Sequence, residues 1–335
     1  MTPPLPKAEL HCHLEGTTSP SLVRRLARRN RIPLPENLLD DGDNFIWSDV
    51  ESFLKTYDQA SSVIRTAEDY RDLTYDYLAS SAKEGALYVE VMSSPDHAAA
   101  AGIDYEGHLE GIVEGIESAE RDHGIIGRII VTCVRHFGPE QAMRVAEAVV
   151  HSPHPYVVGF GMGGNELLYT LREFAPAFSL IDTAGLPTTV HAGEWAGAES
   201  VADALDALPV SRIGHGVRSV DDPALVERLV REGIHLEVCP SSNIATRVYD
   251  DFASHPFNQL RDAGLSLSLN SDDPPYFATS IGWEYLIGSE FFGLDVEALK
   301  LITIEALKYS FANHQTKEEL ITRSPEHCCM KTRAQ

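Results

Sequence analysis

Short strand-like segments alternate with helix-like segments along most of the chain, and this order constrains the fold more than any other feature of the sequence. Strands that alternate with helices form parallel βαβ units, and eight such units predict an α/β fold of the (β/α)8, TIM-barrel type. The predicted strands are residues 7–13, 87–92, 128–134, 156–160, 187–191, 211–215, 234–239 and a run that starts at Leu265 and ends before Asp272. Helices are predicted between them at about 105–122, 139–150, 166–182, 198–207, 221–232 and 253–263.

A doubly wound open sheet is the alternative fold for such a pattern. That fold carries a GxGxxG turn at the start of its first helix, whereas the glycine-rich residues 159–163 lie in mid-chain without that spacing. With 335 residues, 43% of them hydrophobic, the chain can bury a large core, and its size suits one barrel or two modest domains. Because no internal repeat or low-complexity segment interrupts the alternation, we expect a single domain over residues 1–335.

The barrel is expected to carry extra helices after its first strand and at its C-terminal end. A basic helix is predicted at 22–30, and residues 35–85 are longer than one crossover helix requires. Apolar residues recur at helical spacing over 54–64 and again over 70–78, which predicts two amphipathic helices. The first either caps a site or only coats the barrel, and the second is interpreted as the crossover. A last helical region is predicted at about 283–320.

Four residues of the types that bind metals lie at the ends of predicted strands. His11 and His13 share one face of the first strand because side chains alternate along a strand. Asp272 ends the polar face of the last strand, and His191 ends the fifth. In a closed barrel the first and last strands are neighbours, and active sites gather at the carboxyl ends of the strands. Each histidine alone would be an ordinary residue, but together the four side chains predict a zinc site with a position open for water.

Three further residues next to these suit a hydrolytic reaction. Zinc can lower the pKa of a bound water to about 7. Glu194 follows His191 by three positions and is placed to act as general acid and base, although such an acid can also be a plain helix-start residue. His215 ends the sixth strand and could hold or deprotonate the water. Asp273 could orient that water or accept a hydrogen bond from the substrate.

Two other classes of metal hydrolase do not fit the sequence. Binuclear barrel hydrolases often need a bridging lysine at the fourth strand, and residues 156–164 contain none, which favours one zinc per chain. Zinc deaminases that act on nucleic acids combine H-x-E with P-C-x-x-C; His13 and Glu15 match the first motif, but the second is missing.

Charge and composition narrow the range of partners and the compartment. Fifty acidic against 27 basic residues give a formal net charge of −23, which disfavours binding to nucleic acids and to anionic membranes. No apolar signal core opens the sequence and no apolar run has membrane-spanning length, so we expect a cytoplasmic protein. The five cysteines are scattered without a CxxC motif, and Cys328 and Cys329 are expected to lie in a C-terminal tail.

Taken together, these motifs resemble the adenosine deaminase family of zinc-dependent barrel hydrolases over nearly the whole chain. The combination of the HAGE, GHG and SDDP elements in this order is specific. The matching segments are residues 6–16 (PKAELHCHLEG), 161–166 (GMGGNE), 191–194 (HAGE), 212–216 (RIGHG), 237–243 (EVCPSSN) and 268–274 (SLNSDDP).

The resemblance implies hydrolytic deamination of a 6-aminopurine to a 6-oxopurine and ammonia. It implies that Glu194 protonates N1, that His215 handles the water proton, that Asp273 assists at N7, and that the backbone amide of Gly164 meets N3. The zinc ligands that it implies are His11, His13, His191 and Asp272.

Two positions bear on the choice of purine. Adenosine deaminases usually carry aspartate at the position of Glu15, where it contacts the ribose, and glutamate resembles the adenine and aminodeoxyfutalosine deaminases. Adenine deaminases tend to carry serine at the position of Gly164, and the glycine resembles the nucleoside enzymes. We therefore predict adenosine as the substrate, with adenine, or a modified adenine of the aminodeoxyfutalosine type, as the alternative. An inactive barrel that only binds purine or metal is a remote alternative, since no ligand or catalytic acid is missing.

Overall fold

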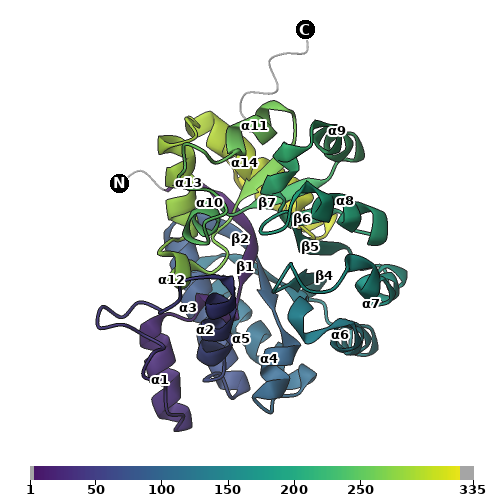
Figure 1. Cartoon of the computed structure of the whole chain (residues 1–335). Helices are drawn as coiled ribbons and strands as arrows, with labels where there is room; N and C mark the ends of the chain where they lie inside the picture. Colours follow the sequence, from purple (N-terminus) through teal and green to yellow (C-terminus); the bar gives the residue numbers. More distant parts are fainter. Residues whose placement is uncertain (1–3, 325–335) are drawn as a thin grey trace.

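The computed structural model describes residues 4–324, and its centre is a sheet of eight parallel strands paired in sequence order from β1 to β8 (Figure 1). This architecture confirms the predicted (β/α)8 barrel. The predicted Cys328 and Cys329 tail lies outside the described residues. The strands are β1 (Lys7–His13), β2 (Ala86–Ser93), β3 (Ile126–Val134), β4 (Val157–Gly163), β5 (Thr188–Ala192), β6 (Arg212–His215), β7 (His235–Val238) and β8 (Ser266–Leu269).

The barrel is closed between β1 and the residues that follow β8. The amide of Leu10 donates to Asn270 Oδ1 at 2.9 Å, so the closing seam begins with a side chain in place of a backbone pair. Further along, the amide of His13 donates to the carbonyl of Asp272 at 3.0 Å, and the amide of Asp272 donates to the carbonyl of His11 at 3.2 Å. The seam therefore brings the predicted ligands of the first and last strands together.

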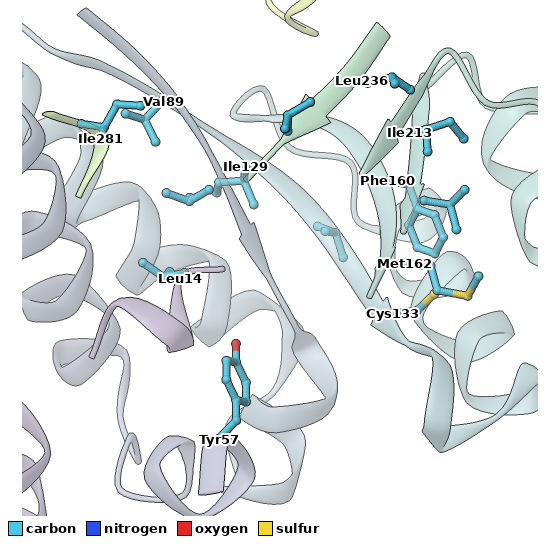
Figure 2. Close-up of a cluster of buried hydrophobic side chains, with 14 of the residues drawn as sticks. Leu14, Tyr57, Val89, Ile129, Cys133, Phe160, Met162, Ile213, Leu236 and Ile281 are labelled. Carbon is cyan, nitrogen blue, oxygen red and sulfur yellow. The ribbon is translucent and has the colours of Figure 1, made fainter. Parts of the chain in front are cut away.

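Helices surround the barrel and pack their apolar faces against the strands (Figure 1). Figure 2 shows part of this layer, in which Val89, Ile129 and Phe160 are fully buried side chains of three strands. No helix among residues 4–324 is long and apolar enough to cross a lipid bilayer. The helices are α1 (Pro20–Asn30), α2 (Val50–Ser61), α3 (Ala67–Lys83), α4 (Pro95–Ala100), α5 (Tyr105–His123), α6 (Pro139–His151), α7 (Leu171–Thr183), α8 (Ala198–Ala207), α9 (Pro223–Glu232), α10 (Pro240–Ala245), α11 (Phe257–Asp262), α12 (Pro274–Phe277), α13 (Ile281–Glu290), α14 (Val296–Tyr309) and α15 (His314–Arg323). Short 3-10 turns are η1 (Glu15–Thr17), η2 (Arg135–Phe137) and η3 (Val217–Asp221).

The two helices predicted between residues 35 and 85 are present as α2 and α3. Both begin with a capping box, formed by Asp49 with Ser52 and by Thr66 with Asp69, so their start points are fixed by local sequence. Helix α3 packs against α5, as a crossover helix does. Helix α2 instead lines the cavity described below, which supports its interpretation as a cap.

Two helix predictions were wrong in their extent. The helix predicted at 166–182 begins only at Leu171, because Glu166 turns its carboxylate to the backbone of another loop and Thr170 caps the helix. The helix predicted at 253–263 is shortened to Phe257–Asp262. The short helices α4, α10 and α12, each of which starts at a proline, were not predicted.

A charged cluster fills part of the barrel interior. The guanidinium of Arg212 is fully buried and lies 2.6 Å from Glu237 Oε1 and 2.7 Å from Glu90 Oε2. Tyr88 donates to the second oxygen of Glu90 at 2.7 Å. Because buried charges are costly unless they are paired, this arrangement holds Glu237 ionised directly beside the predicted metal site. The pKa of Glu237 falls to about 2: burial alone would raise it, but Arg212 and His11 lower it more.

Candidate active site

The four predicted metal ligands converge at the carboxyl end of the barrel. One potential ligand atom from each residue lies within 4.8 Å of the other three, and all four residues are at least partly buried. The strand geometry explains the convergence, since β1 supplies two imidazoles from one face and the closing seam places the last carboxylate beside them. The four residues are His11, His13, His191 and Asp272.

The hydrogen bonds of the histidines leave their Nε2 atoms as lone-pair donors. Nδ1 of His11 donates to Glu237 Oε2 at 2.8 Å, and Nδ1 of His191 donates to the carbonyl of Met162 at 2.8 Å. Nε2 of His11 is buried without a hydrogen-bond partner, and Nε2 of His191 faces Nε2 of His13 at 3.1 Å. This grouping of Nε2 atoms fits a divalent cation held between them, with Glu237 fixing the ring of His11 and the Met162 carbonyl fixing the ring of His191.

Two glycines leave space for these rings. A Cβ added at Gly163, the last residue of β4, would lie 3.2 Å from Cε1 of both His13 and His191. A Cβ added at Gly214 of β6 would lie 2.8 Å from Cε1 of His11. A side chain at either position would therefore crowd these rings.

A second set of donor atoms overlaps the first. The thiol of Cys239 lies within the same distance of His11, His215 and Asp272. Burial raises the pKa of Cys239 well above its usual value, which disfavours the thiolate that binds metals. His13, His191 and Asp272 of the first set line the cavity, whereas only His215 and Asp272 of the second set do. The set with three histidines therefore has more of its members on the cavity wall.

The predicted catalytic residues surround the same point. Nε2 of His215 lies 3.6 Å from Glu194 Oε2 and 3.8 Å from Asp272 Oδ2. The backbones of His215 (φ +58°) and Asp272 (φ +63°) are both left-handed, a conformation that costs about 1–3 kcal/mol and concentrates at functional sites. Both residues line the cavity.

Two of the acids are held in an environment that favours their protonated form. Burial and the nearby carboxylates of Asp272, Glu166 and Asp273 raise the pKa of Glu194 well above its usual value. Burial and the charge of Asp272 likewise raise the pKa of Asp273, and its Oδ1 has no hydrogen-bond partner. Both side chains line the cavity, so each can donate a proton to a group placed there.

The predicted substrate residues Glu15 and Gly164 line the same cavity. Glu15 is only 1% exposed, and its Oε1 accepts hydrogen bonds from Ser93 Oγ at 2.6 Å, the amide of Ser94 at 3.2 Å and the hydroxyl of Tyr70 at 3.3 Å. These donors hold the carboxylate in place, and none of them binds its second oxygen, Oε2. Gly164 has φ +96°, and a Cβ there would lie 2.7 Å from His136 Nδ1, so the local backbone itself requires glycine.

A buried carboxylate that the sequence analysis left without a role positions the catalytic loop. Glu166 accepts the backbone amides of Gly193, Glu194, Trp195 and Ala196 and the hydroxyl of Ser200, at 2.5–3.1 Å. It therefore fixes the loop that carries Glu194. The GMGGNE segment was the only sequence signal that pointed to Glu166. Its partners could not be predicted from the sequence, because they lie about 30 positions later in the chain; Glu194, for example, is 28 positions away.

The wall of the cavity opposite the strands is held by a contact between α2 and α4. Nε2 of His97 lies 2.9 Å from Oδ1 of Asp58, and both residues line the cavity together with Phe53 and Tyr57. His97 is an isolated histidine in an alanine-rich segment, and nothing in the sequence indicated its place. The contact ties the cap to the body of the barrel.

Comparison with known proteins identifies the relatives of this chain. The family model described as Adenosine deaminase matches residues 6–325. A protein named adenine deaminase from Chelativorans sp. (strain BNC1) is 47% identical over 317 residues, which cover 95% of this chain and 97% of the relative. Another of that name from Agrobacterium fabrum is 46% identical over 323 residues, covering 96% and 99% of the two chains.

Solved structures agree with these relatives. The crystal structure of an adenine deaminase from Arthrobacter aurescens has a TM-score of 0.90 and 31% identity and covers 96% of this chain and 98% of that one. An amidohydrolase from Burkholderia ambifaria, with bound Zn, has a TM-score of 0.86 and 27% identity, with 94% and 88% coverage. The metal-binding cluster, the barrel and the family match agree, and the chain belongs to the adenosine deaminase family.

Proposed function

We propose that this protein hydrolyses adenine to hypoxanthine and ammonia, with one Zn²⁺ bound by His11, His13, His191 and Asp272. The observation that carries the choice of substrate is the full-length similarity to proteins named adenine deaminase, at 47% and 46% identity. This replaces adenosine, which the sequence alone had favoured. That preference rested on Gly164. A Cβ at this position would lie 2.7 Å from Nδ1 of His136, which gives a reason for the glycine that is unrelated to the substrate.

The cap forms part of the same cavity. Asp58 of α2 lies 2.9 Å from His97 of α4, and both residues line the cavity. We propose that this wall limits the room beside the purine, which favours a base without a ribose.

Glu15 is proposed to select the free base. Its fixed carboxylate can accept the N9–H that adenine has and adenosine lacks, because the ribose occupies N9. A buried acceptor left without this donor costs affinity, and a site built around a particular polar group can reject an analogue lacking it by roughly 10⁴-fold. The hydrogen bonds from Ser93, Ser94 and Tyr70 hold the carboxylate still for this contact.

The remaining residues are assigned by their place around the cavity. When bound, Zn²⁺ would act as a Lewis acid that activates water for attack on C6. Protonated Glu194 gives its proton to N1 of the purine, and protonated Asp273 donates a hydrogen bond to N7. The Gly164 amide meets N3, and His215 contacts the attacking oxygen. Glu166 holds Glu194 in position through the loop amides.

Steady-state kinetics on adenine and adenosine with one preparation test the proposal. We expect kcat/KM for adenine to exceed that for adenosine by roughly 10⁴-fold, and Glu15→Gln to reduce the preference. Metal analysis of the active protein should give a Zn²⁺ ratio near one. A preference for adenosine would overturn the assignment of Glu15, and a fully metallated protein without activity on either purine would favour the inactive, binding barrel.

A further inference from the structure

A chain of three buried side chains leads away from the cavity behind His215. Nδ1 of His215 lies 3.2 Å from Nδ2 of Asn243, and Oδ1 of Asn243 lies 3.1 Å from Nε2 of His255. The amide of Phe257 meets Nδ1 of His255 at 3.2 Å. His215, Asn243 and His255 are 1%, 0% and 6% exposed, so water does not compete for these contacts. Neither Asn243 nor His255 lines the cavity.

The hydrogen-bond directions in this chain follow from its outer end. A backbone N–H can only donate, so Nδ1 of His255 must accept from Phe257. A neutral imidazole then carries its proton on Nε2 and donates it to Oδ1 of Asn243. Burial lowers the pKa of His255 to about 3, which agrees with a neutral ring. The amide of Asn243 is thereby fixed, and its NH₂ group donates to His215.

These hydrogen-bond directions determine which ring nitrogen of His215 carries the proton. Because Nδ1 of His215 accepts a hydrogen bond, the neutral ring carries its proton on Nε2, which faces the cavity. The distances of 3.6 Å to Glu194 and 3.8 Å to Asp272 are too long for hydrogen bonds and leave Nε2–H free to meet a third group. A ring in this state can donate to an oxygen, but it has no lone pair there to take a proton from water.

We propose that Asn243 and His255 are positioning residues that hold His215 as a hydrogen-bond donor to the attacking oxygen. The sequence had left open whether His215 holds or deprotonates the water, and the geometry selects holding. Glu194, which becomes a carboxylate when it gives its proton to N1 of the purine, is then the group that accepts the water proton; its Oε2 lies 3.6 Å from Nε2 of His215. This inference rests on the proposed deamination, but the tautomer of His215 can be read without any substrate.

The test compares wild-type protein with Asn243→Asp, both loaded with Zn²⁺ and labelled with ¹⁵N-histidine. Aspartate has the shape of asparagine and still accepts from His255, but it cannot donate to His215 and favours a proton on Nδ1. Long-range ¹H–¹⁵N correlation spectra show which ring nitrogen carries the proton, and His215→Gln identifies the signals of His215. We expect Nε2–H in the wild type and Nδ1–H in the variant.

The kcat for adenine should fall when the tautomer of His215 changes. Removing one preorganised donor typically lowers kcat by about 10²–10³-fold, and we expect this loss in Asn243→Asp with bound zinc and KM nearly unchanged. Asn313→Asp is the matched control, because Asn313 caps α15 at the surface and aspartate caps equally well. It should behave as the wild type.

His255 provides a second route if Asn243→Asp does not fold. His255→Gln keeps a donor for Asn243 and should retain Nε2–H on His215, whereas His255→Leu should lose it together with kcat. A wild-type His215 with its proton on Nδ1, or a shifted tautomer with unchanged kcat, would overturn the inference. Nε2–H in a protein that turns over no purine would refute the proposed function and leave the tautomer assignment standing.

Discussion

At the scale of single residues, the site depends on buried carboxylates whose roles differ because their neighbours differ. Glu237 beside Arg212 stays ionised and accepts a hydrogen bond from Nδ1 of His11, whereas Glu194 among other acids favours its protonated form. Glu166 does not line the cavity and instead accepts backbone amides of the loop that carries Glu194. Substitutions of glutamate by glutamine at these positions should therefore have distinct effects.

Glu194→Gln should keep the fold and the bound metal but lose about 10²–10⁴-fold in kcat, because an amide cannot give the carboxyl proton to N1. Kinetics and metal analysis of the same sample measure both quantities. Asp272→Ala is the contrasting variant, in which metal content itself should fall. Full turnover by Glu194→Gln would rule out proton transfer by this side chain.

Glu166→Gln should lower both stability and kcat, because an amide offers one acceptor oxygen where the carboxylate satisfies several donors. Leaving buried donors unpaired costs about 1–3 kcal/mol each, so we expect a loss of at least about 2 kcal/mol in the free energy of unfolding. Denaturant titration measures it. The control is Glu173→Gln, since Glu173 also accepts a backbone amide but lies exposed in the capping box of α7. Equal losses in the two variants would contradict this role.

At the scale of elements, the contact between α13 and α10 is expected to make stability depend on pH. Glu284 of α13 is fully buried, and it accepts hydrogen bonds from the amide of Ser241 at 3.3 Å and from the hydroxyl of Thr279. Burial raises its pKa from 4.5 to about 7, although these hydrogen bonds oppose the shift.

A raised pKa means that the native state keeps a proton which the unfolded chain releases. The stabilisation is therefore complete below pH 4.5 and is lost as the pH rises through about 7. The loss amounts to about 3 kcal/mol, since one pKa unit corresponds to 1.36 kcal/mol. Glu284→Gln should lack this part of the pH dependence, and unfolding titrations between pH 4 and 8 compare the two proteins. If the free energy of unfolding of the two proteins changed in parallel with pH, Glu284 would not be the titrating group.

The sequence predicted the strands better than the segments that follow them. β1 was predicted with its observed ends because its side chains alternate between two faces. The helix predicted from residue 166 begins only at Leu171, because Glu166 lies in a turn and accepts amides of the distant loop at 193–196. The metal ligands could be predicted because strand ends meet in any closed barrel. Glu237, Asn243 and His97 could not, since their partners are defined by three-dimensional packing alone.

At the scale of the whole molecule, the metal is expected to join distant parts of the barrel. The four predicted ligands come from β1, β5 and the segment after β8, so a bound metal would link the two ends of the sheet to its middle. A ligand that binds only the native state stabilises it by about 2.7 kcal/mol at a hundred times its Kd.

Removal of the metal with a chelator should therefore lower the thermal midpoint, and addition of Zn²⁺ should restore it. Differential scanning calorimetry of the apo and reloaded protein measures the shift. His11→Ala, which lacks one ligand, should unfold at the same temperature with and without Zn²⁺. An unchanged midpoint in the wild type after complete removal of the metal would show that the barrel does not depend on the link.

The seam between β1 and the residues after β8 also sets an order of events during synthesis. The three histidines leave the ribosome first, and by then the barrel is still open. Asp272 is the residue whose backbone joins the seam to His11 and His13 and whose carboxylate completes the ligand set. A growing chain therefore holds an incomplete set of imidazoles until its eighth strand docks. We therefore expect closure of the barrel and completion of the predicted metal site to occur in the same step.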